Sequence, residues 1–401
     1  MSFNPGDTAW LIVATAFVVL MTLPGLALFY GGLTPNKNLV NTFMMAFATF
    51  CLVAVLWFIA GYSLAFGPDI GGIIGDLSKV VHISKDSLSG NIPETVFASF
   101  QMTFAAISAV LISGAVIERM KFSSWLLFAG LWVLFIYAPL AHWVWGGGWL
   151  GEHGELDFAG GTVVHISTGI SALVLASLLG HRKRKELPSS PILTAMGAGL
   201  LLVGWIGFNV GSALAADFLA GMALATTLFA AAAGGISWLF IEWLKTGKPT
   251  LVGISSGVVA GLVGITPACG YVDMLAALII GLVSGVLGFF GVTKIKAMLK
   301  KDDALDVFGI HGICGIWGSI ATGLFANPQI QEGCAGLFYG NPNQVIVQLG
   351  GILTTLIFCS VGTFIIAKIV SILTKGLKVD SQLEEYGLDS EVHGEKSFNI
   401  Y

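Results

Sequence analysis

Long apolar runs separated by short polar connections make up most of the chain. Most of these runs reach about 20 residues, the length that an α-helix needs to cross the hydrocarbon core of a bilayer. We count eleven runs, at residues 8–31, 40–66, 94–117, 123–143, 158–180, 191–213, 218–243, 250–266, 272–298, 305–327 and 344–373. The pattern predicts an all-α integral membrane protein with eleven transmembrane helices in one domain, residues 1–375, and a polar tail, residues 376–401.

The connections between the runs alternate in charge. The even-numbered connections contain only two basic residues, Lys79 and Lys85, both in one long loop. The odd-numbered connections contain Lys37, Arg119, Lys121, Arg182, Lys183, Arg184, Lys185, Lys245, Lys248, Lys294, Lys296, Lys300 and Lys301. Because short basic loops stay on the cytoplasmic side, we expect the N-terminus outside and the C-terminus inside.

Composition agrees with a membrane environment. Of the 401 residues, 55% are hydrophobic and 10% are charged, and the mean hydropathy is +0.86. Soluble domains contain about 25% charged residues, so this chain is expected to be surrounded by lipid and to bind no nucleic acid. The five cysteines show no metal-ligand spacing. Cys269 and Cys334 fall near the same predicted membrane face, which leaves a disulfide and two free thiols as open alternatives.

Two histidines lie inside apolar runs at matching positions. Asp157 precedes His165 by eight residues at the start of the fifth run, and Asp303 precedes His311 by eight at the start of the tenth. Five helices in each half invert the second half relative to the first, so the two helices would enter from opposite faces. Helix rise then places each histidine about 12 Å deep, and we expect the two to meet near the midplane.

An ionisable residue inside a membrane span commonly marks a transport pathway or a cofactor site. Three interpretations of the two histidines stay open: a lined pathway, two axial ligands of a haem, and simple hydrogen bonding between helices. The sequence offers no HExxH motif and no third ligand, so we predict no metal and no cofactor. The other histidines are expected in loops, in the tail or at the membrane surface, as for His142.

Aromatic and hydroxyl residues on other spans are candidates for cation binding. Phe104, Trp145 and Phe208 lie near the predicted outer face, together with Ser212. Aromatic faces attract cations, and a hydroxyl oxygen can accept a hydrogen bond from an ammonium N–H group. Ordinary packing and the interfacial aromatic belt are the alternative explanations.

Several segments resemble those of the ammonium transporter family, the Amt/Mep/Rh proteins, in the same order along nearly the whole chain. They are LPGLALFYGG, AHWVWGGGW, DFAGGTVVHI, GWIGFNVGSA, ITPACGY and DVFGIHGICGIWG. The resemblance implies a homotrimer with one pore in each subunit, an inverted five-plus-five repeat followed by a final helix, and a location in the cell membrane, the inner or plasma membrane. It implies a transporter and not an enzyme.

The same resemblance implies roles for individual residues. Phe104, Trp145 and Ser212 would form an outer ammonium-recruitment site, and Phe208 would join Phe104 as a hydrophobic gate. His165 and His311 would be the paired histidines of the pore. Further residues would support the pathway: Asp157, Trp205, Thr266 and Tyr137.

The expected mechanism follows from the cost of burying charge. The sequence shows no ring of carboxylates and no carbonyl filter that would stabilise a bare cation at the midplane. Ammonium, unlike potassium, can give up a proton and cross as neutral ammonia past His165 and His311. The proton is either lost outside, which makes transport electroneutral, or relayed through the histidines, which makes it electrogenic; the resemblance favours the relay. A sensor that binds ammonium with little flux is a further alternative.

The tail has the composition of a disordered, solvated segment. Its YGLDSEVHGE segment resembles the cytoplasmic tail of the same family. That resemblance implies coupling between subunits and regulation by a P-II-type signalling protein, similar to GlnK, that would cover the inner mouths of the pores.

Overall fold

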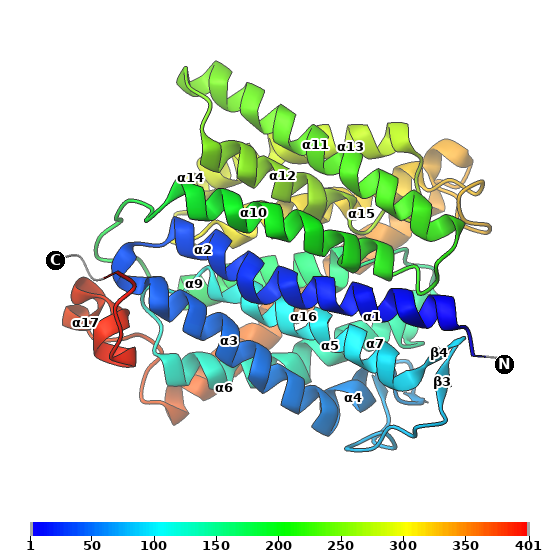
Figure 1. Cartoon of the computed structure of the whole chain (residues 1–401), viewed down its shortest axis with the longest axis horizontal. Coiled ribbons are helices and arrows are strands. Elements are labelled where there is room, and N and C mark those ends of the chain that lie inside the picture. Colours follow the sequence, from blue (N-terminus) through cyan, green and yellow to red (C-terminus); the bar gives the residue numbers. More distant parts are fainter. Residues whose placement is uncertain (1–2, 399–401) are drawn as a thin grey trace.

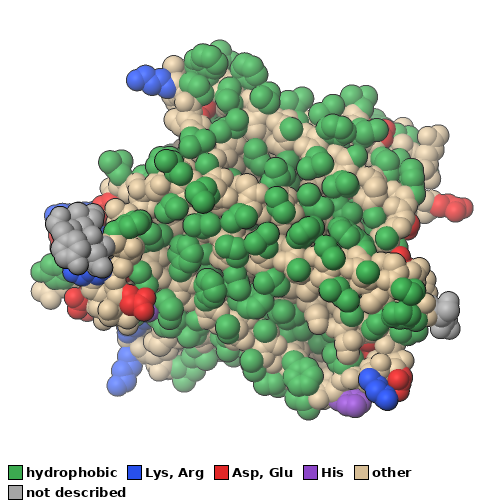
Figure 2. Space-filling view, viewed as in Figure 1, with side chains coloured by type: hydrophobic (Ala, Val, Ile, Leu, Met, Phe, Trp, Pro, Cys, Tyr) green, Lys and Arg blue, Asp and Glu red, His purple; other side chains and the backbone are tan. Residues whose placement is uncertain are grey.

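The computed structural model describes residues 3–398. Helices run side by side in a single bundle, and the two ends of the chain lie at opposite ends of it (Figure 1). On the face shown in Figure 2, hydrophobic side chains cover the broad middle, and charged side chains gather mainly toward the two ends. This distribution is expected of a bundle whose middle faces lipid and whose ends face water.

The first half of the bundle comprises α-helices and short π-helical or 3₁₀-helical segments. Both kinds of short segment are labelled η. Pro24 lies within η1, where an α-helix would otherwise lose a backbone hydrogen bond. The elements are α1 (Pro5–Leu20), η1 (Met21–Leu26), α2 (Ala27–Leu33), η2 (Asn36–Asn38), α3 (Leu39–Leu56), η3 (Trp57–Gly61), α4 (Tyr62–Phe66), α5 (Glu94–Ser113), α6 (Phe122–Trp132), η4 (Val133–Tyr137), α7 (Ala138–Trp145), α8 (Trp149–Glu152), η5 (Gly161–Ile166) and α9 (Ser167–Leu179).

The remainder of the bundle is built from the same kinds of element and ends in the longest α-helix described. Its elements are α10 (Pro191–Trp205), η6 (Ile206–Val210), α11 (Phe218–Thr246), α12 (Leu251–Ile265), α13 (Met274–Phe290), η7 (Gly291–Ile295), α14 (Lys296–Leu299), η8 (Phe308–Gly312), α15 (Ile313–Phe325), η9 (Leu337–Tyr339) and α16 (Asn343–Leu373).

Ten continuous helical segments between residues 3 and 398 are long and apolar enough to cross a membrane. They coincide with ten of the eleven predicted spans. The predicted eighth span falls on α12, which has 15 residues and is therefore about 22 Å long, less than the roughly 30 Å of a hydrocarbon core. Since α12 packs against α10, α11, α13 and α15, it lies within the bundle.

The two histidine-bearing segments cross one another. Segment η5 packs against η8 and α15, while η8 packs against α9, as expected for two helices that pass in opposite directions. Glycines four residues after each histidine make the approach close. A Cβ on Gly169 would lie 2.5 Å from the Gly312 Cα, and a Cβ on Gly315 would lie 3.0 Å from the His165 Cβ. The predicted meeting of His165 and His311 is confirmed.

Two small antiparallel hairpins close one end of the bundle. They pair β1 (Asp69–Ile70) with β2 (Ile74–Gly75), and β3 (Leu88–Ser89) with β4 (Ile92–Pro93). The prediction that His142 is a surface residue is wrong. Its ring is fully buried and contacts the Ala65 carbonyl oxygen at 2.9 Å and the Asp69 carboxylate at 2.9 Å, so it joins α7 to the first hairpin.

The tail is folded onto the bundle, so the prediction of a disordered, solvated segment is wrong for residues 376–398. It forms α17 (Ser381–Tyr386) and η10 (Asp389–His393). The buried Asp389 accepts hydrogen bonds from the backbone N–H groups of Val40 and Asn41, at 2.9 and 2.8 Å. A carboxylate at the start of α3 satisfies donors that the helix leaves free, so the tail caps a membrane helix.

All five cysteines are free thiols. Cys269 is buried and Cys334 is partly buried. Of the two alternatives left open by the sequence, this supports two free thiols and not a disulfide.

Candidate functional site

A cavity of about 310 Å³ opens at the end of the bundle that contains the hairpins and the N-terminus. Phe104 of α5, Trp145 at the end of α7 and Ser212 just after η6 all line it, so the structure brings together the three predicted recruitment residues. The rest of its lining is Phe66, Phe97, Gln101, Val144, Phe158 and Leu214. We call this cavity the vestibule.

The polar atoms of the vestibule are fixed by backbone hydrogen bonds. The Trp145 Nε1 donates to the Asp157 carbonyl oxygen at 2.8 Å, which sets the tilt of the indole ring. The Ser212 hydroxyl donates to the Phe208 carbonyl at 2.9 Å. Since a hydroxyl has one proton and two lone pairs, Ser212 keeps its oxygen available as an acceptor.

Two stacked phenyl rings separate the vestibule from the interior. The ring centroids of Phe104 and Phe208 lie 4.1 Å apart with an interplanar angle of 20°. Trp145 meets Phe104 edge-on, with centroids 6.0 Å apart. Both phenylalanines are almost completely buried, and we call this stacked pair the phenyl barrier.

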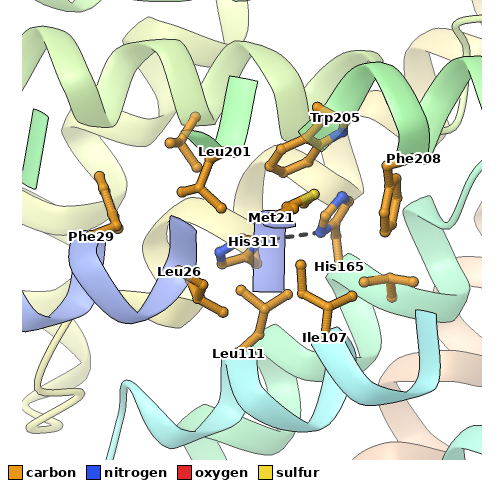
Figure 3. Close-up of a pocket in the computed structure, with 12 residues that line it drawn as sticks. Met21, Leu26, Phe29, Ile107, Leu111, His165, Leu201, Trp205, Phe208 and His311 are labelled. Carbon is orange, nitrogen blue, oxygen red and sulfur yellow. Dashed lines mark hydrogen bonds between the residues drawn. The ribbon is translucent and has the colours of Figure 1, made fainter. Parts of the chain in front are cut away.

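The histidine pair lies directly behind this barrier. The ring centroids of Phe208 and His165 are 6.1 Å apart, and those of His165 and His311 are 5.3 Å apart. The two Nδ1 atoms contact each other at 3.2 Å, shown by the dashed line in Figure 3. For neutral rings this contact requires one Nδ1 to donate and the other to accept. His165 Nε2 is buried and has no partner within residues 3–398.

Trp205 holds the first histidine from the side. Its indole ring is stacked on the His165 imidazole, with centroids 5.4 Å apart. The Trp205 Nε1 donates to the Thr266 hydroxyl at 2.9 Å, and that hydroxyl lies 2.8 Å from the Leu262 carbonyl oxygen, to which it donates. Thr266 therefore fixes the orientation of the Trp205 indole and lines none of the cavities described here.

A narrow cavity is lined by the two histidines. Its volume of about 10 Å³ is close to the minimum that admits one water molecule. Figure 3 shows His165 and His311 surrounded by aliphatic and aromatic side chains. The lining residues are Met21, Leu26, Phe29, Ile107, Leu111, Val164, His165, Leu201, Trp205, Phe208, Val259 and His311. The two imidazoles carry the strong hydrogen-bonding groups of this lining, because the Trp205 N–H is already donated to Thr266.

A second wide cavity begins where the narrow one ends. Phe29 lines both, and the wide cavity has a volume of about 220 Å³. Its lining is mostly apolar but includes the carboxylates of Glu242 and Asp306. The vestibule, the phenyl barrier, the narrow cavity and this inner cavity thus follow one another through the bundle.

Asp157 caps the helix that carries His165. Its carboxylate accepts from the backbone N–H groups of Gly160, Gly161, Thr162 and Val163 at 2.6 to 3.2 Å. It also accepts from the Thr162 hydroxyl at 2.7 Å. Asp157 lines none of the three cavities, and its hydrogen bonds fix the start of η5.

Tyr137, a predicted site residue, lies away from the other residues of the site. It is buried against Trp57 and Trp132 and lines none of the cavities described above. The sequence did not identify the aliphatic residues that line the narrow cavity, such as Ile107 and Leu111. Their pattern along the chain does not differ from that of ordinary core residues. Asn209 was also missed, although a buried amide in an apolar run was a signal; it bonds Thr227 behind the barrier.

Within residues 3–398, no group of three or more His, Cys, Asp or Glu side chains is placed to hold a metal ion.

Comparison with known proteins agrees with this arrangement. A model of the Ammonium Transporter Family matches residues 9–398. The chain belongs to this family. An ammonium transporter of Aquifex aeolicus (strain VF5) is 50% identical, with 99% of this chain and 94% of the relative aligned. An ammonium transporter of Bacillus subtilis (strain 168) is 47% identical, with 98% of each aligned.

Solved structures of family members share the fold. The crystal structure of Candida albicans Mep2 matches with a TM-score of 0.89 and 34% identity, covering 95% of this chain and 88% of Mep2. A structure described as a sensor Amt protein matches with a TM-score of 0.90 and 27% identity, covering 96% and 98%. The chain is thus a multi-pass membrane protein with the fold of this family.

Proposed function

We propose that this protein transports ammonium across the membrane by binding it in the vestibule, removing one proton and conducting ammonia past His165 and His311. The observation that best supports the proposal is the order of the cavities: an aromatic vestibule that includes a hydroxyl, a stacked phenyl barrier, and a narrow apolar passage lined by the histidine pair. Membership of the Ammonium Transporter Family supports the same substrate.

Recruitment uses the charge of ammonium. The faces of Phe104 and Trp145 attract a cation, and the free lone pair of the Ser212 hydroxyl accepts one N–H bond. The aromatic faces attract any small cation, whereas the hydroxyl contact favours one that donates a hydrogen bond. Ammonium is therefore held better than potassium, which donates none.

Passage requires loss of the charge. A cation would leave its hydration shell at the Phe104–Phe208 barrier and find few polar groups in the narrow cavity, which is a large energetic penalty. Ammonia incurs no such penalty. It can accept a hydrogen bond from one imidazole and donate to the other, which keeps it in contact with polar groups along an otherwise apolar passage.

The proton is proposed to follow a separate route through the histidine pair. The contact between the two Nδ1 atoms joins the rings into a short hydrogen-bonded chain along which a proton can move. Transport by this route is electrogenic. If the proton instead stays outside, the protein is an electroneutral ammonia channel, and if there is little flux it is a sensor.

The proposed setting is the cell membrane, the inner or plasma membrane. We propose eleven crossings, with α12 as the short eighth one, arranged as an inverted five-plus-five repeat and a final helix. The basic connections support a cytoplasmic C-terminal end and an N-terminus outside. The N- and C-termini lie at opposite ends of the bundle (Figure 1), which supports an odd number of crossings.

The proposed assembly is a homotrimer with a pore in each subunit. Residues 376–401 are proposed as a cytoplasmic regulatory region that couples subunits and responds to a P-II-type, GlnK-like protein. The contact between Asp389 and the start of α3 supports this role, because a change in the tail would act directly on a membrane helix.

Transport is tested with purified protein in liposomes that contain a pH-sensitive dye. An ammonium gradient should change the internal pH faster than in protein-free liposomes, and a potassium gradient should not. Equal rates with and without the protein would reject transport and leave the sensor.

A further inference from the structure

A second acid, Glu155, lies behind the vestibule and belongs to none of the groups described above. It stands in the connection between α8 and η5 and is 6% exposed. Helix α16 fixes the residues on either side of it. The Gln344 side chain donates to the Gly154 carbonyl at 2.8 Å, and the Gln348 side chain both donates to the Leu156 carbonyl and accepts from its N–H, each at 2.8 Å.

The Glu155 carboxyl occupies a space that a glycine leaves open. A Cβ on Gly351 of α16 would lie 2.4 Å from the carboxyl carbon of Glu155 and 2.6 Å from its Oε2. The other oxygen, Oε1, lies 2.7 Å from the Thr162 hydroxyl. The carboxyl is thus packed against the backbone of one helix and bonded to the first turn of another.

The Thr162 hydroxyl contacts two carboxyl groups at once. It lies 2.7 Å from Glu155 Oε1 and 2.7 Å from Asp157 Oδ2. One hydroxyl has a single proton, and an ionised carboxylate can only accept. Both contacts are hydrogen bonds only if one of the two acids carries a proton and donates it to the Thr162 oxygen.

The other partners of the two acids decide which one is protonated. Asp157 accepts four backbone N–H groups in addition to the Thr162 hydroxyl, and these donors match an ionised carboxylate. Glu155 Oε2 has no partner within residues 3–398. Leaving a neutral carbonyl oxygen without a partner costs less than leaving a buried charged one.

We propose that Glu155 is a positioning residue that acts in its protonated form. Its carboxylic acid donates to the Thr162 hydroxyl, and that hydroxyl donates to the ionised Asp157. The chain fixes the Asp157 loop, whose carbonyl holds the Trp145 ring in the vestibule at 2.8 Å and whose carboxylate caps the helix of His165. Through these contacts a single proton on Glu155 orients both the recruitment site and the pore.

Ionisation of Glu155 breaks this chain. Burial and the charge of Asp157 raise the pKa of Glu155 to about 8. Asp157 is the charged neighbour that acts on Glu155 among the described residues; α16 presents neutral groups to it, and η5 presents Thr162. Above this pH two adjacent carboxylates compete for one hydroxyl proton, so the Asp157 loop loses a bond and Trp145 loses its fixed support.

Infrared difference spectroscopy tests the protonation state without depending on transport. Subtracting the spectrum of Glu155→Gln from that of the unmodified protein at pH 7 should show the C=O band of a protonated carboxylic acid, and above pH 9 the bands of a carboxylate. Glu152→Gln, the same change at an exposed position three residues earlier, should show a carboxylate at pH 7. A carboxylate band from Glu155 at pH 7 would overturn the proposal.

The positioning role rests on the proposed transport function and is tested by a pH profile. The amide introduced by Glu155→Gln can donate to Thr162 at every pH, so the ratio of ammonium transport in this variant to that of the unmodified protein should rise with pH. One unit above a pKa of about 8 the ratio should approach about tenfold, since about nine-tenths of the carboxyls are ionised. Because both proteins are measured at the same pH, the change in the proportion of ammonium to ammonia with pH does not affect this ratio.

Two further outcomes keep the conclusions separate. A ratio that stays flat from pH 6 to pH 9 would overturn the positioning role even if the infrared band is present. If neither protein carries ammonium, the proposed function fails, and the infrared difference alone decides whether Glu155 is protonated. Replacing Thr162 with Ser should preserve the pH profile, whereas Thr162→Val should remove its dependence on Glu155.

Discussion

His165 and His311 face each other through their Nδ1 atoms, 3.2 Å apart, at the crossing of two helix starts. The contact depends on features of both segments: each carries a glycine four residues after its histidine, and each begins with a π-helical turn. The pair is therefore a product of the crossing and not of either helix alone.

The Trp145 ring is expected to supply cation–π binding in the vestibule. Trp145→Leu should raise the ammonium concentration for half-maximal transport about 5- to 30-fold, because a partly desolvated cation–π contact contributes about 1 to 2 kcal/mol. The matched control is Trp143→Leu, since Trp143 packs on Phe358 outside the vestibule. Equal effects of the two changes, measured as ammonium-dependent flux, would argue against a recruitment role.

The Tyr137 hydroxyl is expected to contribute little. It is buried without a hydrogen-bond partner in the described part of the chain, and its ring lines no cavity described here. Tyr137→Phe should leave ammonium flux unchanged and should not lower the unfolding temperature, since it removes a polar group that nothing satisfies. A large loss of flux would show instead that the hydroxyl contacts the transported molecule or ordered water.

Asp389 is expected to hold the tail on the bundle. Asp389→Ala removes the acceptor for two N–H groups at the start of α3, which should cost about 0.5 to 2 kcal/mol and release residues 376–398. Limited proteolysis should cut the tail of the variant faster than that of the unmodified protein. Glu391→Ala, at an exposed position of the same segment, is the control and should not change the rate.

Asp302 is expected to make stability depend on acid pH. Burial alone would raise the pKa of Asp302, but the hydrogen bonds and charge of Arg182, 2.9 Å away, outweigh burial and hold that pKa below its ordinary value. The ionised form therefore stabilises the fold above about pH 4, and this contribution is lost as the pH falls through the folded-state pKa.

The Asp302 prediction is measured by thermal unfolding in detergent. Asp302→Asn should lower the unfolding temperature at pH 7, because breaking one partner of a buried ion pair costs about 3 to 5 kcal/mol. The difference from the unmodified protein should shrink at about pH 3. Asp86→Asn, at an exposed position, should have little effect at either pH. An equal loss at both pH values would mean that the carboxylate charge is not what stabilises the fold.

The sequence alone predicted ten spans that the structure confirms and the pairing of the histidines. Apolar length defines a membrane helix, and the matching positions of Asp157 and Asp303 before the two histidines predicted the crossing. The recruitment residues were found through resemblance, since nothing in the pattern separates a vestibule phenylalanine from a packed one.

The folding of the tail and the burial of Glu155 could not be predicted from the sequence in the same way. Composition suggested a solvated tail, but the stabilising partners of Asp389 are backbone groups about 350 positions earlier in the chain. In the sequence, Glu155 is an ordinary acidic residue in a loop. In the structure α16 packs against it, and this packing depends on the absence of a side chain at Gly351. Long-range contacts of this kind leave no local pattern.

The most direct test of the account is the current evoked by an ammonium pulse on proteoliposomes, recorded for the unmodified protein and for a variant with leucine at both His165 and His311. The account predicts a saturable ammonium current without a potassium current in the unmodified protein, and no ammonium current in the variant. An undiminished ammonium current after both replacements would contradict the proton relay through the histidine pair.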